Sequence, residues 1–291
     1  MGSNHSHNHQ HDSTKNIKVA FFLNITFTVF EIIGGLWTNS MAILSDAVHD
    51  LGDSLSLGLS WYLDKKSKQD ANNRFSFGYR RFSLLGALIN GIVLISGSIF
   101  LLFEIIPRLI EPQHSNAKGM LVFAIFGIIV NGAAVLRVKG GKTLNERVVS
   151  LHLLEDVLGW VAVLIVSIIL LFWDIPILDP ILSILILSYV LFNVVKNLKQ
   201  TLLVFLQGVP SDIDLPSLES KISEIDNVVS VHQLQLWSLD GAEHVLTIHI
   251  VIEEGTSVNE IISLKRNVKA LLNESQVEHA TIEIEFENED C

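Results

Sequence analysis

Residues 45–53 read SDAVHDLGD, a charged run inside an apolar segment that extends from about Met41 to Leu63. The segment has roughly the 20 residues that a helix needs to cross a bilayer. Charged side chains at that depth cost roughly 2.5–3.5 kcal/mol each on insertion scales, so they usually face a bundle interior or a water-filled cavity. On a helix, His49 and Asp53 share one face because they are four residues apart. The run therefore predicts a membrane helix with a functional polar face.

The same pair recurs near the start of another apolar run, where His152 and Asp156 are again four residues apart. Two such faces that meet offer two imidazole nitrogens and two carboxylate oxygens, a tetrahedral set suited to Zn²⁺. A single buried histidine often only hydrogen-bonds a neighbouring backbone, but two copies on separate spans favour a joint ion site. Imidazole favours zinc over harder ions, while Co²⁺, Cd²⁺, Mn²⁺ and Fe²⁺ remain alternatives.

The composition is that of a membrane protein with a separate acidic part. The 291 residues are 49% hydrophobic, with a mean hydropathy of +0.44, which is too apolar for an ordinary soluble protein. The lone Cys291 excludes an intrachain disulfide, and the polar N-terminus lacks the apolar stretch of a signal peptide. From Gln207 onward, 17 acidic residues face four basic ones, a net charge of −13. Such an acidic part does not favour nucleic acid.

We predict three regions: a histidine-rich tail over residues 1–16, a six-helix transmembrane domain over 17–206, and a soluble domain over 207–291. The six spans are each near the required length: about Ile17–Trp37, Met41–Leu63, Phe82–Pro107, Met120–Leu136, Val148–Trp173 and Leu178–Val195, the last continuing amphipathically towards Leu206.

Positive charge sets the expected orientation. The loops between spans two and three and between spans four and five hold ten lysines and arginines, whereas the opposite loops hold two. The positive-inside rule therefore places both termini in the cytoplasm, which agrees with an even number of spans. We expect a multi-pass protein of the cell (inner) membrane.

Other polar residues are open to two interpretations. Glu31, Asp46 and Asn131 lie in the spans and either support the metal ligands or only bind neighbouring helices. Residues 1–16 alternate histidine with small polar residues and will not fold alone. This tract is either a weak metal collector or an inert tail.

The soluble domain alternates helix and strand patterns. Asp214-Leu215-Pro216 begins a helix that runs to about Ile225, and Val258 to Leu272 is helix-periodic. Strands are predicted over 228–239, 243–253 and 281–287, with Asp240-Gly241 as a turn. In the last strand, Ile282, Ile284 and Phe286 are expected inward and the glutamates outward. The order αββαβ gives a small sheet with helices on one face.

Several motifs in order resemble the cation diffusion facilitator family of proton-coupled zinc transporters. The matching stretches are EIIGG at 31–35, NSMAILSDAVH at 39–49, FGYRRF at 77–82, ALIN at 87–90 and VHQLQLWS at 231–238. The resemblance implies six helices, a metallochaperone-like cytoplasmic domain and a homodimer. It also implies that His49, Asp53, His152 and Asp156 are the transport site, and that His232, His249 and Glu285 bind metal in the cytoplasmic domain. Gln235 replaces the second histidine of the family's tail motif.

We therefore expect no enzyme but a secondary transporter that exports Zn²⁺ in exchange for H⁺, with Zn²⁺ also as a regulatory ion. Metal binding needs neutral imidazole and ionised carboxylate, so protons compete with the metal. Two other functions remain open. An intramembrane metal hydrolase would use Glu155 or Asp50 as a base, although four protein ligands leave no position for water. A membrane-tethered metal sensor would bind zinc without flux.

Overall fold

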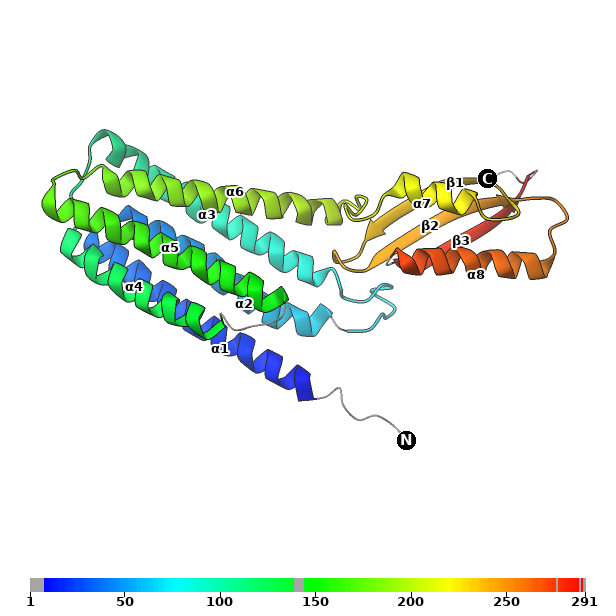
Figure 1. Cartoon of the computed structure of the whole chain (residues 1–291), viewed down its shortest axis with the longest axis horizontal. Coiled ribbons are helices and arrows are strands. Elements are labelled where there is room, and N and C mark those ends of the chain that lie inside the picture. The colour runs from blue at the N-terminus through cyan, green and yellow to red at the C-terminus, as the bar shows by residue number, and fades with distance from the viewer. Residues whose placement is uncertain (1–7, 68, 139–143, 276, 288, 290–291) are drawn as a thin grey trace. The chain divides into compact units, whose positions relative to one another are not determined.

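The computed structural model describes residues 8–67, 69–138, 144–275, 277–287 and 289 (Figure 1). Side chains are described from residue 21 onward in these ranges, except at 60–61, 64–65, 137–138 and 144–152. Two compact units emerge from the contacts, and each is described by itself. One contains residues 89–197 and the chain up to 63, and the other contains 64–88 and the chain from 198 onward.

The first unit is built from long helices. The helices are α1 (Asn8–Thr38), α2 (Met41–Ser67), α3 (Phe82–Ile110), α4 (Ala117–Val138), α5 (Leu144–Phe172) and α6 (Leu178–Phe205). Five of them, all but α2, are long and apolar enough to cross a membrane within the described residues. The carboxylates and histidine of residues 46–53 lower the hydropathy of α2 below that of a simple span.

Part of the N-terminal tract continues the first helix. Residues 1–16 were predicted not to fold alone, and α1 begins at Asn8 as an extension of the apolar span that carries the backbone of His9 and His11. Each residue added to an existing helix gains a hydrogen bond without a new nucleation cost, so the apolar span extends the helix backwards. His5 and His7 lie outside the described residues. The predicted continuation of the sixth span is confirmed, since α6 runs to Phe205.

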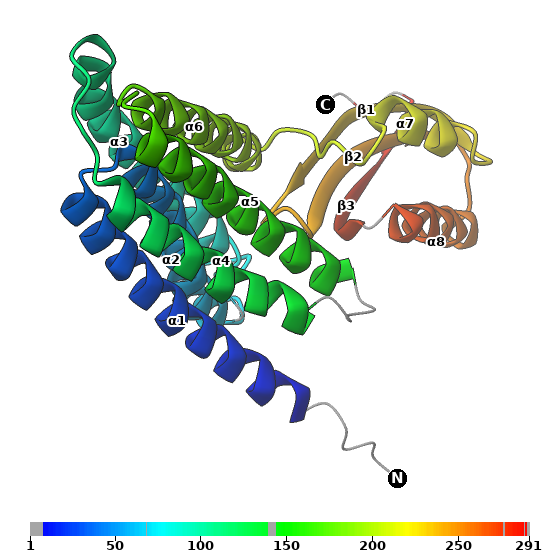
Figure 2. The ribbon, with the colours of Figure 1, turned by 60° about the vertical axis from the view of Figure 1, so that its left-hand side comes forward.

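Aromatic side chains fill the helical bundle. Trp160 of α5 is 1% exposed and packs beside Phe27 of α1 and the buried Phe123 of α4. Helices α4 and α5 lie side by side along their length in both views (Figure 1, Figure 2). Gly127 permits this approach, because a Cβ there would lie 2.2 Å from the indole of Trp160. Small residues at such positions let membrane helices pack closely.

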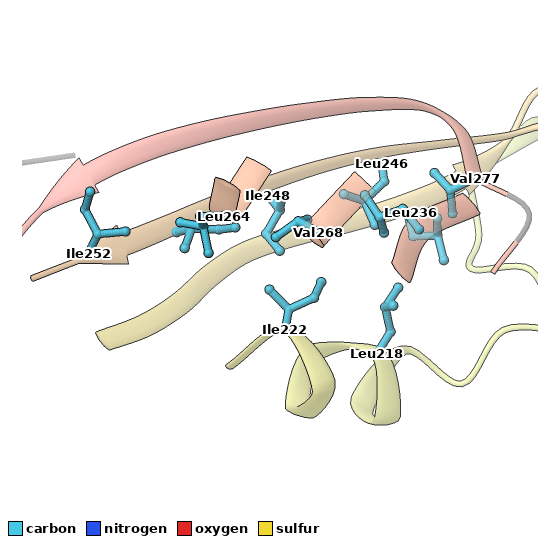
Figure 3. Close-up of a cluster of buried hydrophobic side chains, with 11 residues drawn as sticks. Leu218, Ile222, Leu236, Leu246, Ile248, Ile252, Leu264, Val268 and Val277 are labelled. Atoms are coloured by element: carbon cyan, nitrogen blue, oxygen red, sulfur yellow. The ribbon is translucent and has the colours of Figure 1, made fainter. Parts of the chain in front are cut away.

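The second unit contains an αββαβ domain in the predicted order. Its elements are α7 (Leu215–Ser223), β1 (Val228–Ser238), β2 (His244–Ile252), α8 (Val258–Glu274) and β3 (Val277–Phe286). The sheet order is β1-β2-β3, with β1 antiparallel and β3 parallel to β2. Side chains from both helices meet one face of the sheet, where Leu218, Leu246, Ile248, Leu264 and Val268 form the core (Figure 3).

The third strand differs from the sequence prediction in two ways. It begins at Val277, four residues before the predicted start, because pairing with β2 is already established from there. Phe286, predicted inward, is 41% exposed because it lies at the last pair of the strand, opposite Ile252. Glu285 keeps its predicted face, away from the helices, but is only 7% exposed because histidines cover it there.

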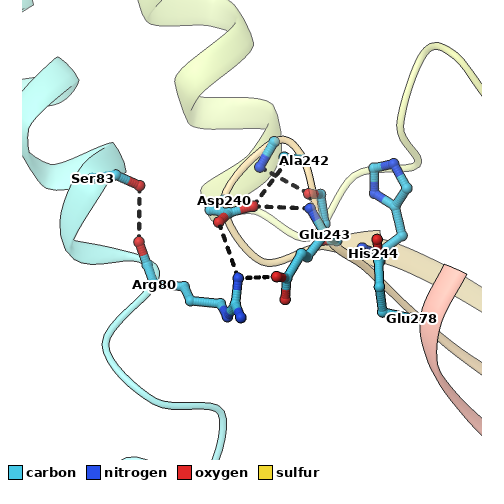
Figure 4. A network of polar contacts seen from close by, with 9 residues as sticks. Arg80, Ser83, Asp240, Ala242, Glu243, His244 and Glu278 are labelled. Carbon is cyan, nitrogen blue, oxygen red and sulfur yellow. Dashed lines mark hydrogen bonds and ion pairs between the residues drawn. The ribbon is translucent and has the colours of Figure 1, made fainter. Parts of the chain in front are cut away.

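The loop between α2 and α3 belongs to the same unit as this domain. Phe75, Tyr79 and Phe82 form an aromatic cluster within it, and Gly78 adopts a φ of 72°, which a side chain would strain. Arg80 then reaches the turn between β1 and β2, where its guanidinium pairs with Asp240 and Glu243 (Figure 4).

Candidate metal centres

The polar face of α2 brings three potential ligands together. His49 Nδ1 lies 3.5 Å from Asp53 Oδ2 and 3.4 Å from Asp50 Oδ1. One ligand atom from each of the three residues lies within 4.8 Å of the others. The His49 and Asp53 side chains are 21% and 32% exposed, which leaves the pair accessible. The side chain of Asp50 turns towards the adjacent His49.

The second predicted pair lies on α5. The Asp156 carboxylate lies within electrostatic range of Asp46 and Glu31, so α5 presents this residue towards α2 and α1. Gly159, less than one turn further, faces Asp46, whose Oδ1 would lie 3.5 Å from an added Cβ. The side chain of His152 lies outside the described residues. The structure thus brings Asp156 to the carboxylates around the α2 face, and the position of His152 remains a sequence prediction.

Two of the predicted supporting residues are buried nearby. Glu31 of α1 is 0% exposed and lies beside Asp46 and Asp50. Asn131 of α4 is 9% exposed, and its Nδ2 donates no hydrogen bond to the described part of the chain. Buried polar groups with open hydrogen-bonding capacity are usual where water or an ion enters a bundle.

The C-terminal sheet brings together the other predicted set, one residue from each strand. His232 of β1 pairs in register with His249 of β2, and Glu285 of β3 reaches both rings. Glu285 Oε2 lies 3.2 Å from His232 Nε2, and its Oε1 forms a short contact with His249 Nδ1. The three potential ligand atoms lie within 4.8 Å of one another. Two imidazoles and a carboxylate are a donor set that suits zinc.

A β-bulge contributes to this cluster, which we call the sheet cluster (His232, His249 and Glu285). Register shifts between His232 and Gln235, and Gln233 has a φ of 49°. Bulges of this kind redirect a side chain and often lie beside functional sites. Glu283, which the sequence analysis did not single out, lies 3.5 Å from His249 Nε2 through its Oε2. Glu283 is the β3 residue that pairs with His249 of β2, and the sequence alone does not reveal this pairing.

Two family models match the chain. The cation efflux transmembrane domain matches residues 17–206, and the cation efflux protein cytoplasmic domain matches residues 210–287. Similar proteins include the cadmium, cobalt and zinc/H(+)-K(+) antiporter of Bacillus velezensis, which is 34% identical and covers 97% of this chain and 91% of its own length.

Two further relatives agree. The metal cation efflux system protein CzcD of Cupriavidus metallidurans is 34% identical, covering 98% of this chain and 91% of the relative. The zinc transporter ZitB of Pectobacterium atrosepticum is 34% identical, and the match covers 99% of this chain and 90% of the relative.

Proposed function

Because the chain belongs to the cation diffusion facilitator family of metal-cation efflux transporters, which are not enzymes, we propose that it exports Zn²⁺ in exchange for H⁺. Co²⁺ and Cd²⁺ are further substrates, as the name of the Bacillus relative suggests. The transport site consists of His49, Asp53, His152 and Asp156. The protein is a multi-pass membrane protein, and its soluble part is the cytoplasmic domain.

One observation carries the assignment of the site. On α2, the ligand atoms of His49 and Asp53 point towards each other on a partly accessible face. Asp156 of α5 interacts electrostatically with Asp46, which lies on α2 as well. Their chemistry suits a dehydrated divalent ion, since two imidazoles and two carboxylates complete a tetrahedral shell when His152 joins. Glu31, Asp46 and Asn131 support these ligands, the first two as carboxyl groups and Asn131 through its amide.

We further propose that α2 also crosses the membrane, which brings the number of spans from five to six. Its charged face is directed to the bundle interior, where a functional membrane helix tolerates such residues. Six spans with the positive loops on one side support a topology with both termini in the cytoplasm. We expect the protein in the inner membrane. The cytoplasmic domains of two copies associate, giving a homodimer.

Zinc export then depends on proton competition. The ligands hold metal only with neutral imidazoles and ionised carboxylates, so metal binding releases protons. When the site faces the opposite side, protons bind the histidines and displace the metal. The bundle rocks around a site near the middle of the membrane, as in other secondary transporters.

The sheet cluster is proposed as a second zinc site with a regulatory role. The two imidazoles would supply neutral nitrogen donors and Glu285 an anionic oxygen, a set that fits zinc without cysteine. Because each strand contributes one ligand, zinc would link all three strands. Its binding energy would therefore stabilise this form of the sheet.

The deciding experiment measures Zn²⁺ flux into proteoliposomes that hold a proton gradient. Wild type is compared with Asp156→Ala, and Asp174→Ala, at an exposed loop position, serves as the matched control. We expect gradient-driven flux that only Asp156→Ala abolishes. Stoichiometric zinc binding without flux would instead identify a sensor, and flux that survives Asp156→Ala would move the site elsewhere.

A further inference from the structure

A buried carboxylate far from the metal ligands holds the start of α2. Asp179, in the first turn of α6, is 1% exposed. Its Oδ1 accepts a hydrogen bond of 2.5 Å from Ser40 Oγ and one of 3.3 Å from the Ala42 amide. Its Oδ2 accepts a hydrogen bond of 2.7 Å from the Met41 amide and one of 3.2 Å from Ser115 Oγ. One side chain of α6 therefore satisfies two of the open amides at the N-terminus of α2.

The turn before α2 is also held by the end of α3 and by the loop that follows α3. Asn39 adopts a φ of 55°, and its carbonyl accepts hydrogen bonds from Arg108 Nη1 at 3.1 Å and from Ser115 Oγ at 3.2 Å. The Asn116 amide donates to the Thr38 carbonyl at 2.7 Å. The end of α3 and the loop that follows it thus hold the same turn that Asp179 holds from α6.

The contact between α2 and α6 continues one turn further. Ser183, four residues after Asp179, lies 2.5 Å from Ser45 through the two Oγ atoms and donates to the Met41 carbonyl at 3.1 Å. Ser45 and Ser183 are both 0% exposed. We call this set, Ser40, Ser45, Asp179 and Ser183, the α2–α6 seam. Polar contacts of this kind between membrane helices fix their register, because a displaced group loses its partners in an apolar surrounding.

We propose that Asp179 is a positioning residue for metal transport, which fixes the position of α2 along its helix axis and its rotation about that axis. His49 begins about 12 Å further along the same rigid helix, at 1.5 Å per residue from Met41. A shift of α2 against α6 therefore moves His49 and Asp53 against the ligands on α5. Asp179 is not one of the proposed metal ligands. The proposal rests on the proposed function, since it takes the α2 residues as the transport site.

An amide cannot replace the carboxylate here. In Asp179→Asn one oxygen becomes an NH₂ donor, which would face hydroxyl and amide groups that already donate, and the negative charge favoured at a helix N-terminus is lost. We expect the zinc Kd of the membrane site to rise by about tenfold or more, as when other groups that orient metal ligands are removed. Asp174→Asn is the matched control, because Asp174 precedes the same helix but is 81% exposed beside His114.

The measurement is zinc binding to the full-length protein in detergent, by competition with a chromophoric chelator. His232→Ala and His249→Ala are introduced throughout, so that the membrane site dominates the signal. Cys291→Ser removes the single native thiol. A disulfide between Ser45→Cys and Ser183→Cys, whose side chains already meet, then fixes the seam without Asp179.

We expect Asp179→Asn to weaken zinc binding, Asp174→Asn to leave it unchanged, and the disulfide to restore it in Asp179→Asn until a reductant is added. An unchanged Kd in Asp179→Asn would overturn the proposal, as would a formed disulfide that restores nothing. If Asp179→Asn does not fold, Ser115→Ala removes one of the four donors and should raise the Kd to a smaller extent. Wild type that binds no more zinc than Asp156→Ala would overturn the proposed site instead.

Discussion

The Arg80 guanidinium forms an ion pair with the Glu243 carboxylate, and so joins the loop before α3 to the turn between two strands (Figure 4). Asp240 belongs to the same ion pair network, because its Oδ2 lies 3.9 Å from Arg80 Nη1. Its Oδ1 accepts hydrogen bonds from the backbone amides of Ala242 and Glu243. The acceptor side of the pair is therefore ordered by the turn itself. The Arg80 carbonyl also accepts a 2.8 Å hydrogen bond from Ser83 Oγ, in the first turn of α3.

Arg80→Glu is expected to release this loop. Because Arg80 is 42% exposed, the pair contributes at most about 1 kcal/mol, which corresponds to roughly a fivefold loss of hydrogen-exchange protection in the loop. Exchange measured by mass spectrometry on the full-length protein tests this. Arg80→Glu with Glu243→Arg should recover the protection, whereas Lys269→Glu, an exposed charge reversal on α8, should have no effect. Equal exchange in wild type and Arg80→Glu would contradict the role of the pair.

Gly127→Ala is expected to destabilise the helical bundle. The new Cβ would lie within 2.2 Å of the Trp160 indole, so α4 and α5 must separate or the ring must leave its place, at a cost of about 1–3 kcal/mol. A melting curve in detergent should show a lower midpoint. Gly132→Ala, on the same helix, is the control, because its added Cβ meets no neighbouring side chain within 4 Å among the described residues, and it should melt no lower than wild type. Equal midpoints for the two variants would refute the packing argument.

The first turn of α8 should lose stability in acid. The pKa of Glu260 is lowered because its carboxylate accepts hydrogen bonds from the side chain and the backbone amide of Ser257, in a capping box. A carboxylate with a depressed folded pKa stabilises the fold above its unfolded pKa of about 4.3, and this stability is lost as pH falls through the lower folded value.

Glu260→Gln should make the stability of the first α8 turn less dependent on pH. This stability is measured by hydrogen exchange of the turn, corrected for the intrinsic rate and compared between pH 7 and pH 3. We expect wild type to lose more protection than Glu260→Gln over this range. The exposed Glu253→Gln should behave like wild type, and a Glu260→Gln profile identical to wild type would show that the capping carboxylate contributes nothing.

Zinc binding to the sheet cluster should depend on Glu285. Glu285→Gln keeps the size of the side chain but removes the anionic carboxylate whose two oxygens each reach one histidine, so we expect zinc binding at this site to be lost or weakened by about 10–100-fold. Metal content after dialysis should fall by one zinc per protomer relative to wild type. Glu253→Gln, an exposed glutamate just after β2, is the control. Full retention of zinc in Glu285→Gln would place the metal elsewhere.

The sequence was informative wherever chemistry follows local spacing. His49 and Asp53 are four residues apart on a helix, so their meeting needed only the period of the helix. Apolar alternation likewise predicted the strand over 243–253, whose alternate residues Leu246, Ile248, Ile250 and Ile252 are all buried. Local patterns were sufficient because both features depend on a single element.

Features that join distant elements were not visible in the sequence. Asp179 looked like an ordinary acidic residue in the first turn of a helix, and its partners Ser40 and Ser115 lie 139 and 64 residues away. The early start of β3 was hidden because Glu278 and His279 interrupt the apolar pattern, and pairing with β2 outweighs that local signal. Tertiary contacts decided each of these cases.

The strand order of the C-terminal sheet leaves β3 at one edge, and this strand carries Glu278, Glu283 and Glu285. An open strand edge is a template on which another molecule can add its own strand. Two copies of this edge would bring rows of like charge together, which disfavours pairing of β3 with β3 from another molecule. Protonation of these glutamates at low pH would remove the repulsion and make such pairing easier.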